Sequence, residues 1–425
     1  MSFFERAKKK ASVRKRSLVA ACAQCGRRKK AKNLTGKIIP PGIPVSGRGD
    51  KKILLIRDQP TAYIDVSRNW FSRQNKKPSF IMTALRNADI EPEEDCWMTG
   101  AAVCFGTGHP LLAIESCLPN LDRTIQELQP KVIIPIGLNA IHAVMSFLWR
   151  DESMGDLAHF IGHQMPAKRW NAWVCPVYDS AYIMSLGYKN SSTPDLLSGT
   201  GIVAYLWLER YIKAAVEKLG EPPFPVEDKK NIIQFLYTVN DISEALEWIG
   251  NSLRGYAVID YETNCIKPEV TGARVLCAAV CFGGFHKVQK IIAFPMLHDV
   301  IPAWVKFLQS PIPKVAHNCK FEDRWSNVYF KTPVTNWVGD TMLNAHILDC
   351  RTGITGLKFQ TAVNFGIVGY EDATKPYMTS GEGKLNRLHE VPLETLLKYC
   401  AHDTLFTWRL FIKQMKQFGM SAYWK

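Results

Sequence analysis

The sequence lacks a long apolar stretch, and this absence excludes membrane-spanning proteins. None of its 425 residues begins a run of the roughly 20 consecutive apolar residues that a transmembrane helix needs. The segment "KRSLVAACA" superficially imitates a secretory signal, but its apolar run is only about seven residues long and leads into more basic residues. We therefore expect a protein that is neither embedded in a membrane nor secreted.

Acidic residues are scarce at the start of the chain. Residues 1–33 contain one acid, Glu5, against twelve Lys or Arg, so this segment supplies most of the formal net charge of +14. Such a basic arm can neutralise nucleic-acid phosphates, and the alternative is a solubilising tail. We favour the phosphate-binding arm because the charge is concentrated beside a C-x-x-C pair, Cys22 and Cys25.

The twelve cysteines do not form a disulfide framework of loops. Most lie in apolar segments, which fits a reducing compartment. Cys22 and Cys25 lie in a basic stretch instead, and Cys104 and Cys117 lie near expected strand and helix ends. Four cysteines in two sequence clusters suit tetrahedral zinc or an iron–sulfur cluster. Since a second C-x-x-C pair is absent, buried cysteines without a metal remain the alternative.

The length of the chain predicts two domains of roughly 150–200 residues each. The segment "KLGEPPFPVEDKKN" combines three Pro, a Gly and a cluster of charges, which is typical of a linker. The predicted organisation is a basic arm with the C-x-x-C pair (1–35), a first domain (36–217), the linker (218–231) and a second domain (232–425).

Both predicted domains have an α/β pattern. In the first, short apolar strands alternate with helical stretches, which predicts a three-layer α/β/α domain with a largely parallel sheet. In the second, three strand candidates follow one another before the helices begin, which predicts an opening antiparallel meander. The expected strands are 51–59, 95–104, 130–138 and 172–178 in the first domain, and 256–263, 273–282, 288–296 and 313–319 in the second.

Acidic side chains gather at three places in the second domain. Asp260 and Glu262 end the apolar strand "YAVIDYET", where alternation places both on one face. Asp403 follows Tyr399 by four residues, one helical turn, beside an apolar helix stripe. Glu322 follows Asn318 at the start of another expected helix. Buried carboxylates are costly unless something pairs with them, and in this grouping we expect a metal.

In this order and spacing the acids resemble the DEDDy group of RNase H-like nucleases, specifically the proofreading 3′ to 5′ exonuclease domains of family A DNA polymerases of phage type. The resemblance covers about residues 232–425, and "GDTMLNAHILDCRTGITGLKF" is similar to the family's stretch between its second and third motifs. The matching residues are Asp260 and Glu262 for D-x-E, Asn318, Phe321 and Glu322 for the second motif, and Tyr399 and Asp403 for Y-x-x-x-D.

The resemblance implies a site for two Mg²⁺ or Mn²⁺ ions, which take hard oxygen ligands. It implies that Asp260, Glu262 and Asp403 hold one ion, that Asp260 also touches the second, and that Glu322 supports the second through water. It further implies that Tyr399 positions the attacking water together with Glu262. Two ions of this kind can activate a water and stabilise the leaving 3′ oxygen in phosphodiester cleavage.

The second motif departs from the family, which usually has Asp where this sequence has Glu322. Asp323 follows directly, but neighbouring helical residues point about 100° apart, so the register favours Glu322 and leaves the choice of acid open. Asp340 in "GDTML" is expected to be a helix N-cap rather than a ligand. Phe321 and Trp325 are expected to be core residues rather than base-stacking groups.

The first half, roughly residues 20–213, resembles the iron–sulfur class of uracil-DNA glycosylases. This implies a 4Fe-4S cluster, with zinc as the alternative, at Cys22, Cys25, Cys104 and Cys117. The catalytic motifs differ: Asp58 and its neighbours replace the family's G-E-A-P-G, and Asp179 replaces its catalytic His. A carboxylate has the wrong sign to stabilise a departing uracil anion. We therefore expect a domain without uracil excision that binds DNA or a partner protein.

These observations predict a metal-dependent 3′ to 5′ DNA exonuclease of the bacterial or infected-cell cytoplasm, acting on single-stranded DNA or a frayed primer 3′ end. Since the chain ends soon after Y-x-x-x-D, proofreading would need a separate DNA polymerase chain. An independent exonuclease that trims DNA or RNA ends is the alternative within enzymes, because nothing here distinguishes the sugar. A DNA-binding scaffold that recruits a polymerase, with weak or absent nuclease activity, is the alternative of another class.

Overall fold

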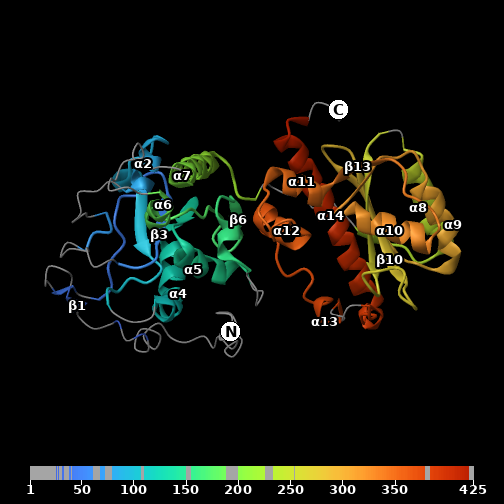
Figure 1. The fold of residues 1–425 in the computed structure, drawn as a ribbon, viewed down its shortest axis with the longest axis horizontal. Coiled ribbons are helices and arrows are strands. Elements are labelled where there is room, and N and C mark those ends of the chain that lie inside the picture. The colour runs from blue at the N-terminus through green and yellow to red at the C-terminus, as the bar shows by residue number, and fades with distance from the viewer. Residues whose placement is uncertain are drawn as a thin grey trace. The chain divides into compact units, whose positions relative to one another are not determined.

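The chain folds into two compact units, drawn in Figure 1 and described here one at a time. One comprises Met1–Pro225 with Val363–Gly366, and the other comprises Val226–Ala362 with Ile367–Lys425. The division after Pro225 falls within the segment 218–231. The computed structural model describes residues 25, 27, 31–32, 38–39, 41–60, 68–71, 79–106, 110–149, 155–187, 200–224, 233–252, 254–378 and 383–420.

The first unit is built around a five-stranded sheet in the order β4-β3-β5-β7-β6. The first four strands run parallel and β6 is antiparallel to β7, so the prediction of a largely parallel sheet is confirmed. The strands are β3 (Ile53–Arg57), β4 (Cys96–Gly100), β5 (Val132–Pro135), β6 (Met165–Ala167) and β7 (Ala172–Val174), with β1 (Ala31–Lys32) and β2 (Ile38–Ile39) forming a separate pair.

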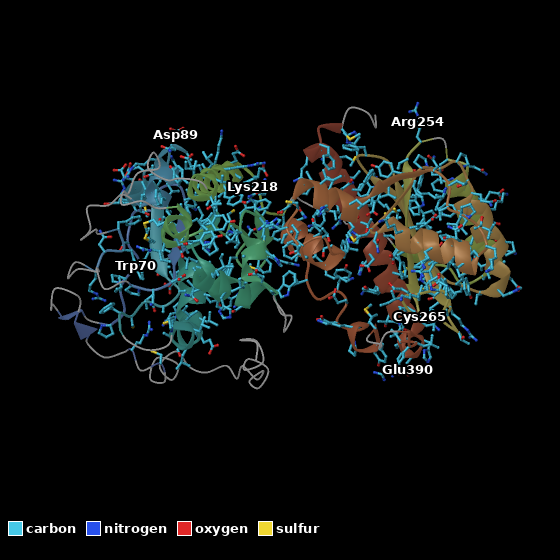
Figure 2. The ribbon with its side chains drawn as sticks, in the orientation of Figure 1. Trp70, Asp89, Lys218, Arg254, Cys265 and Glu390 are labelled. Carbon is cyan, nitrogen blue, oxygen red and sulfur yellow. The ribbon has the colours of Figure 1, made fainter. Side chains whose placement is uncertain are left out.

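Helices cover both faces of this sheet, and the apolar residues of β3 are therefore buried on both sides. Ile53 and Leu55 belong to the core cluster that also includes Trp70, labelled in Figure 2, and residues of α2 and α7. Leu54 and Ile56 point to the opposite face and are equally inaccessible to solvent. The helices are α2 (Phe80–Arg86), α3 (Pro92–Asp95), α4 (Pro110–Leu128), α5 (Leu138–Leu148), α6 (Ser180–Gly187) and α7 (Thr200–Glu217).

The second unit contains a six-stranded mixed sheet in the order β13-β12-β9-β10-β11-β8. Strands β9, β10 and β11 form the antiparallel meander that the sequence predicts, whereas β12 and β13 add in parallel beside β9 and β8 adds in parallel beside β11. The strands are β8 (Ile233–Phe235), β9 (Tyr256–Thr263), β10 (Val275–Gly283), β11 (Val288–Pro295), β12 (Lys314–Ala316) and β13 (Trp337–Asp340).

Two apolar clusters cover the two faces of this second sheet. On one face, Leu397 and Phe411 of the long helix α14 pack against Val258 of β9. On the other, Trp304 and Trp325 pack beside Tyr261, and Phe321 lies partly buried against them, so the prediction that Phe321 and Trp325 are core residues is confirmed. The helices are α8 (Val239–Gly250), α9 (Ile301–Leu308), α10 (Cys319–Tyr329), α11 (Thr341–Leu348), α12 (Leu357–Phe365), α13 (Lys375–Met378) and α14 (Leu393–Gln417).

The remaining helical segments are short, and none of the described helices is of the membrane-spanning kind. Short 3-10 turns complete the helical content at η2 (Leu157–Phe160), η4 (Lys218–Gly220), η5 (His298–Val300) and η6 (Leu388–Glu390). Among the residues that the structure describes, no helix combines the length and the apolar character needed to cross a membrane.

Candidate metal centre

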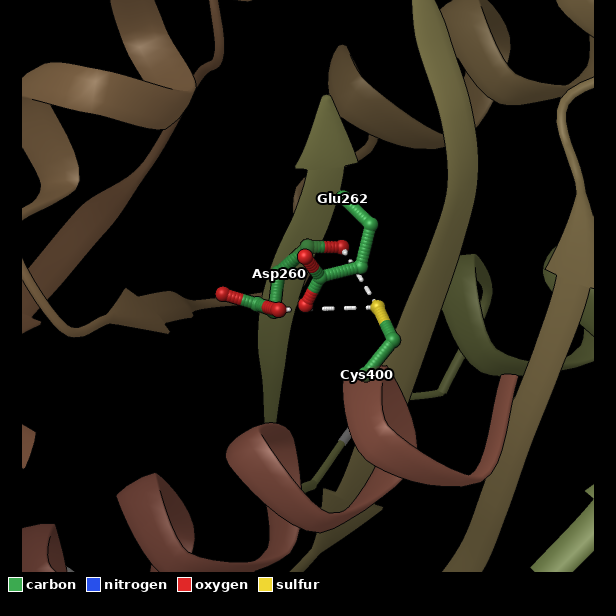
Figure 3. A group of neighbouring side chains, drawn as sticks. All are labelled: Asp260, Glu262 and Cys400. Carbon is green, nitrogen blue, oxygen red and sulfur yellow. Dashed lines mark hydrogen bonds between the residues drawn. The ribbon is translucent and has the colours of Figure 1, made fainter. Parts of the chain in front are cut away.

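The second half of β9 brings two carboxylates and a thiol together, as Figure 3 shows. Asp260 and Glu262 project from one face of the strand toward Cys400 of α14, and one ligand atom from each lies within 4.8 Å of the others. Tyr261 points to the opposite face, where its hydroxyl contacts Ser326 Oγ at 2.9 Å. The alternation predicted for this strand is therefore confirmed, while Cys400 was not predicted as part of the site.

Burial makes the charged form of these acids costly. Glu262 is only 7% exposed, and its pKa is raised well above the ordinary value, first by burial and then by repulsion from Asp260. The pKa of Asp260 is raised in the same way, by burial and then by the nearby Asp403. A cation bound among these groups would offset both effects, because opposite charge favours the ionised carboxylates.

Glu322 of α10 faces this site, whereas Asp323 does not. Glu322 is 2% exposed, its Oε2 atom has no hydrogen-bond partner in the described part of the chain, and its pKa is raised by burial and by Asp260. Asp323 instead accepts hydrogen bonds from Asn327 Nδ2 at 3.1 Å and from Trp337 Nε1 at 3.4 Å. Of the two neighbouring acids, Glu322 is thus the one whose buried oxygen is available to a cation.

Asp340 fixes the start of the helix that carries Glu322. Its carboxylate accepts the backbone N–H groups of Asn318 and Cys319, each at 3.0 Å, and that of Met342 at 2.9 Å. Asn318 can serve as the boundary residue because it adopts a left-handed conformation with φ of 71°. The prediction that Asp340 is an N-cap is confirmed for α11, and the same side chain also caps α10.

Tyr399 and Asp403 lie one turn apart on α14 and share a partner that was not predicted, Lys358 of α12. The Lys358 ammonium donates to Tyr399 Oη at 2.7 Å and to Asp403 Oδ1 at 3.0 Å. Tyr370 donates its hydroxyl to the same Asp403 oxygen at 2.5 Å. Asp403 is therefore already paired, and the pKa of Tyr399 is raised by burial and by the Asp403 charge.

The sequence contained a weak signal for Lys358 and none for Tyr370. Lys358 lies at the end of the stretch "GDTMLNAHILDCRTGITGLKF", which carried part of the family resemblance, but nothing in its residue type indicates an inward orientation. Tyr370 lies beyond that stretch. Both reach the site only through the packing of α12 and the following residues beside α14.

The donor set fits a divalent cation. The structure gathers Asp260, Glu262 and Glu322 closely enough for the charge of Asp260 to act on the other two, and one buried oxygen of Glu322 has no partner among the residues that the structure describes. Carboxylate oxygens are the ligands that Mg²⁺ and Mn²⁺ prefer. Glu322 and Asp403 are not members of the tight group formed by Asp260, Glu262 and Cys400.

The predicted four-cysteine site in the first unit stays a prediction. Cys22 lies outside the described residues, while Cys25 is partly exposed and Cys117 is buried in α4. Cys104 accepts a hydrogen bond from the Gly42 backbone N–H at 3.2 Å. Within the described ranges, these cysteines do not form a group of three ligand atoms like the one around Asp260.

The two acids that replace the glycosylase motifs lie near each other at the carboxyl ends of the inner strands of the first unit's sheet. Asp58, directly after β3, accepts hydrogen bonds from Asn139 Nδ2 at 3.0 Å and from the Ala140 backbone N–H at 2.9 Å. Asp179 accepts the Tyr182 backbone N–H at 2.6 Å, at the start of α6. Gly137 passes close by with φ of 85°, where a Cβ atom would lie 2.9 Å from Asp179 Oδ2.

Comparison with known families bears on the second unit. Residues 237–418 match the 3′-5′ exonuclease family. The matched range contains β9, α10 and α14, and therefore every acid of the candidate centre. Residues 237–418 thus match a 3′-5′ exonuclease domain, and this match supports nuclease activity with divalent metal ions such as Mg²⁺. No curated protein sequence matches the chain significantly.

Three solved structures with some likeness to this chain are distant in sequence. The catalytic core of RRP6 from Trypanosoma brucei is 15% identical over 47% of this chain and 51% of that chain, with a TM-score of 0.35. Brucella melitensis NrnC with bound Mg²⁺ is 18% identical over 45% and 85%, with a TM-score of 0.31. Escherichia coli RNase D is 14% identical over 45% and 46%, with a TM-score of 0.33. The chain spans about half of the RRP6 structure.

Proposed function

We propose that the second unit is a divalent-metal-dependent 3′ to 5′ exonuclease that acts on DNA. The observation that carries the proposal is the convergence of Asp260, Glu262 and Glu322 at one end of β9, with a buried oxygen of Glu322 lacking a partner within the described residues. This convergence lies inside the segment that matches the 3′-5′ exonuclease family. A bound cation stabilises a buried set of mutually repelling carboxylates, and it would add to the Lys358 charge and the Cys400 thiol that already favour ionised Asp260.

The four carboxylates of the centre are assigned to metal binding. Asp260, Glu262 and Asp403 would hold one ion, and Glu322 would support a second. When bound, two Mg²⁺ or Mn²⁺ ions supply an activated water and stabilise negative charge at the leaving 3′ oxygen. The carboxylates themselves are aimed inward from β9, α10 and α14, so the sheet and two helices fix their positions before substrate arrives.

The role proposed for Tyr399 is to orient the attacking water. Burial and the Asp403 charge raise the pKa of Tyr399, so its hydroxyl stays protonated at neutral pH. The Tyr399 oxygen accepts a hydrogen bond from Lys358 Nζ at 2.7 Å. A phenol that already accepts one bond can still donate its own proton, and that proton is available to a water beside Glu262.

The proposed substrate is single-stranded DNA or the frayed 3′ end of a primer. The basic arm of residues 1–33 supports a polyanionic substrate, since its positive charge suits contacts with phosphates. We propose that the first unit binds DNA or a partner without excising uracil, and that a separate polymerase chain is the partner. In the cysteine site of this unit we propose a 4Fe-4S cluster, with zinc as the alternative.

A second candidate function is a DNA-binding scaffold with a weak or absent nuclease. The observation that favours it is the engagement of Asp403, which Lys358 and Tyr370 already pair with. If this pairing persists, Asp403 contributes less to a metal ion and cleavage slows. The scaffold would then recruit a polymerase to DNA through its basic arm and first unit.

The deciding experiment follows single-stranded oligonucleotides labelled at the 3′ or the 5′ end, as DNA and as RNA of the same sequence, with Mg²⁺ or Mn²⁺. Wild type is compared with Asp260→Ala, and Asp299→Ala serves as control because this acid of the same unit is exposed. Stepwise metal-dependent loss from the 3′ end of DNA, abolished only by Asp260→Ala, is expected. Absence of cleavage by folded wild type would overturn the nuclease and favour the scaffold, and preferential RNA cleavage would overturn the DNA substrate.

A further inference from the structure

Cys400 places a sulfur atom where the family resemblance calls only for oxygen. Its side chain comes from α14 and points at Asp260, with Sγ 3.5 Å from Asp260 Oδ2 and 3.6 Å from the Asp260 backbone oxygen (Figure 3). Ligand atoms of Cys400, Asp260 and Glu262 lie within 4.8 Å of one another. Two carboxylates and one thiol are thus gathered from two separate elements of the fold.

One spacing within this group fits a tetrahedral metal site. With a zinc–sulfur bond of about 2.3 Å and a zinc–oxygen bond of about 2.1 Å, the two ligand atoms at a tetrahedral angle lie about 3.6 Å apart. The distance of 3.5 Å between Cys400 Sγ and Asp260 Oδ2 is close to that value. Cys400 and Asp260 therefore already have the spacing that such an ion requires, and the ligand atoms of the whole group lie within 4.8 Å of one another.

A second observation points independently to a bound cation. Glu322, which is 2% exposed, keeps its Oε2 atom without a hydrogen-bond partner in the described part of the chain, and after burial the charge of Asp260 contributes most to raising its pKa. Glu322 reaches the site from α10, so it belongs to neither of the elements that carry the group of three. A buried carboxylate with an unpartnered oxygen, close enough to Asp260 for the two charges to interact, indicates room for a positive charge there.

We propose that Asp260, Glu262 and Cys400 form a binding site for a thiophilic divalent cation, of which Zn²⁺ is the biological example, and that this cation excludes Mg²⁺ from the centre. The sulfur decides the selectivity, because thiolate ligands favour Zn²⁺ and related soft ions while Mg²⁺ requires oxygen ligands in octahedral array. Exclusion of Mg²⁺ rests on the proposed nuclease function, whereas binding of the ion rests on the geometry alone.

A second thiol lies beside the first. Cys277 of β10 pairs with Glu262 across the two strands, and its thiol interacts with that of Cys400. Cys277 is not a member of the group of three, and it contacts that group through the Cys400 thiol. Cys281 lies farther along the same strand, is equally buried, and faces the same apolar cluster without joining the site.

The test titrates Cd²⁺, a spectroscopically visible thiophilic ion, into protein stripped of metal with a chelator. All proteins carry Cys22→Ser and Cys25→Ser, which remove two of the four cysteines of the other predicted metal site. The sulfur-to-cadmium charge-transfer absorption is compared among this parent, Cys400→Ser, Cys400→Ala and the matched control Cys281→Ser. Thermal unfolding verifies that each variant folds, and serine can replace the thiol as a donor toward Asp260.

The parent and Cys281→Ser are expected to show a saturable absorption band that both Cys400 variants lose, with affinity reduced at least about 10–100-fold, as for loss of ligand support. An unchanged band in folded Cys400→Ala would overturn the proposal. If the protein cleaves DNA, Zn²⁺ should inhibit the Mg²⁺-supported rate in the control far more than in Cys400→Ser, each normalised to its own uninhibited rate. Loss of the band without any cleavage would sustain this site while the nuclease proposal fails.

Discussion

Both units place an acid beside the end of a central strand, half-buried in one unit and buried in the other, and the two acids have different hydrogen-bond partners. Asp58, after β3, receives hydrogen bonds from Asn139 Nδ2 and the Ala140 backbone N–H, at 3.0 and 2.9 Å. Glu322, facing the end of β9, has a buried oxygen with no partner among the described residues. Burial raises the pKa of both acids. Hydrogen bonds from Asn139 and Ala140 oppose this effect at Asp58, and the backbone N–H of Glu322 itself opposes it at Glu322.

The difference distinguishes a structural acid from one prepared for a ligand. Neutral donors supply what Asp58 needs, and its carboxylate links β3 to the first turn of α5. Glu322 lies instead near other carboxylates, so it keeps a proton in the metal-free protein and its ionised form becomes favourable when a cation enters. A buried acid without a full set of hydrogen bonds, more than a buried acid as such, therefore points to the candidate metal centre at the end of β9.

The largest expected effect contrasts two isosteric substitutions that each remove one negative charge. Glu262→Gln should lower the rate of metal-dependent cleavage about a thousandfold, or about 4 kcal/mol of transition-state stabilisation, because one ligand to the ion is weakened. Asp58→Asn should leave that rate unchanged. Steady-state cleavage of a 3′-labelled strand measures both, and a comparable loss of activity in Asp58→Asn would contradict the assignment of the two edges.

The next effect is on the stability of the first unit. Asp58→Ala should lower the free energy of unfolding of this unit by about 1–3 kcal/mol, because Asn139 Nδ2 and the Ala140 N–H lose their acceptor. Urea unfolding monitored by tryptophan fluorescence measures the change. Asp58→Asn retains an acceptor oxygen and should lose less stability, so equal losses in the two variants would show that the hydrogen bonds are not what Asp58 contributes.

A smaller effect concerns pH in the metal-free protein. Since the pKa of Glu322 is raised on folding, the folded state keeps a proton that the unfolded state has released, and stability falls as pH rises above the unfolded value of about 4.3. Glu322→Gln removes this proton linkage, so the variant should gain stability relative to wild type between about pH 5 and about pH 8. Urea unfolding in a chelator measures the gain, which Mn²⁺ should reverse.

Much of the candidate metal centre could be predicted from the local periodicity of strands and helices. The period of two in a strand places Asp260 and Glu262 on one face, and the four-residue spacing places Tyr399 and Asp403 on one side of a helix. The register of α10 favoured Glu322 over Asp323, and the structure places their side chains in that way. These relations involve residues close together in the chain, where backbone geometry alone decides direction.

Contacts between distant segments could not be predicted in this way. Cys400 lies 140 residues from Asp260, and in the sequence it is indistinguishable from the apolar stripe of its helix. Lys358 reaches Asp403 only because α12 packs beside α14. Strands β8 and β13 are three and four residues long, too short for alternation to be recognised. Tertiary packing supplies all of these features.

The smallest expected effect concerns Lys358, which pairs with Asp403 as the Asn139 amide pairs with Asp58. Lys358→Met removes an ammonium that competes with a metal ion for Asp403, so the apparent affinity for Mn²⁺ should rise a few-fold. The same change removes the hydrogen bond to Tyr399, so the cleavage rate at saturating Mn²⁺ should fall. Mn²⁺ titrations of cleavage separate the two quantities. A fall in both would mean that Lys358 holds the ligands in place rather than competing for them, and Asp403 would then resemble Asp58 more than Glu322.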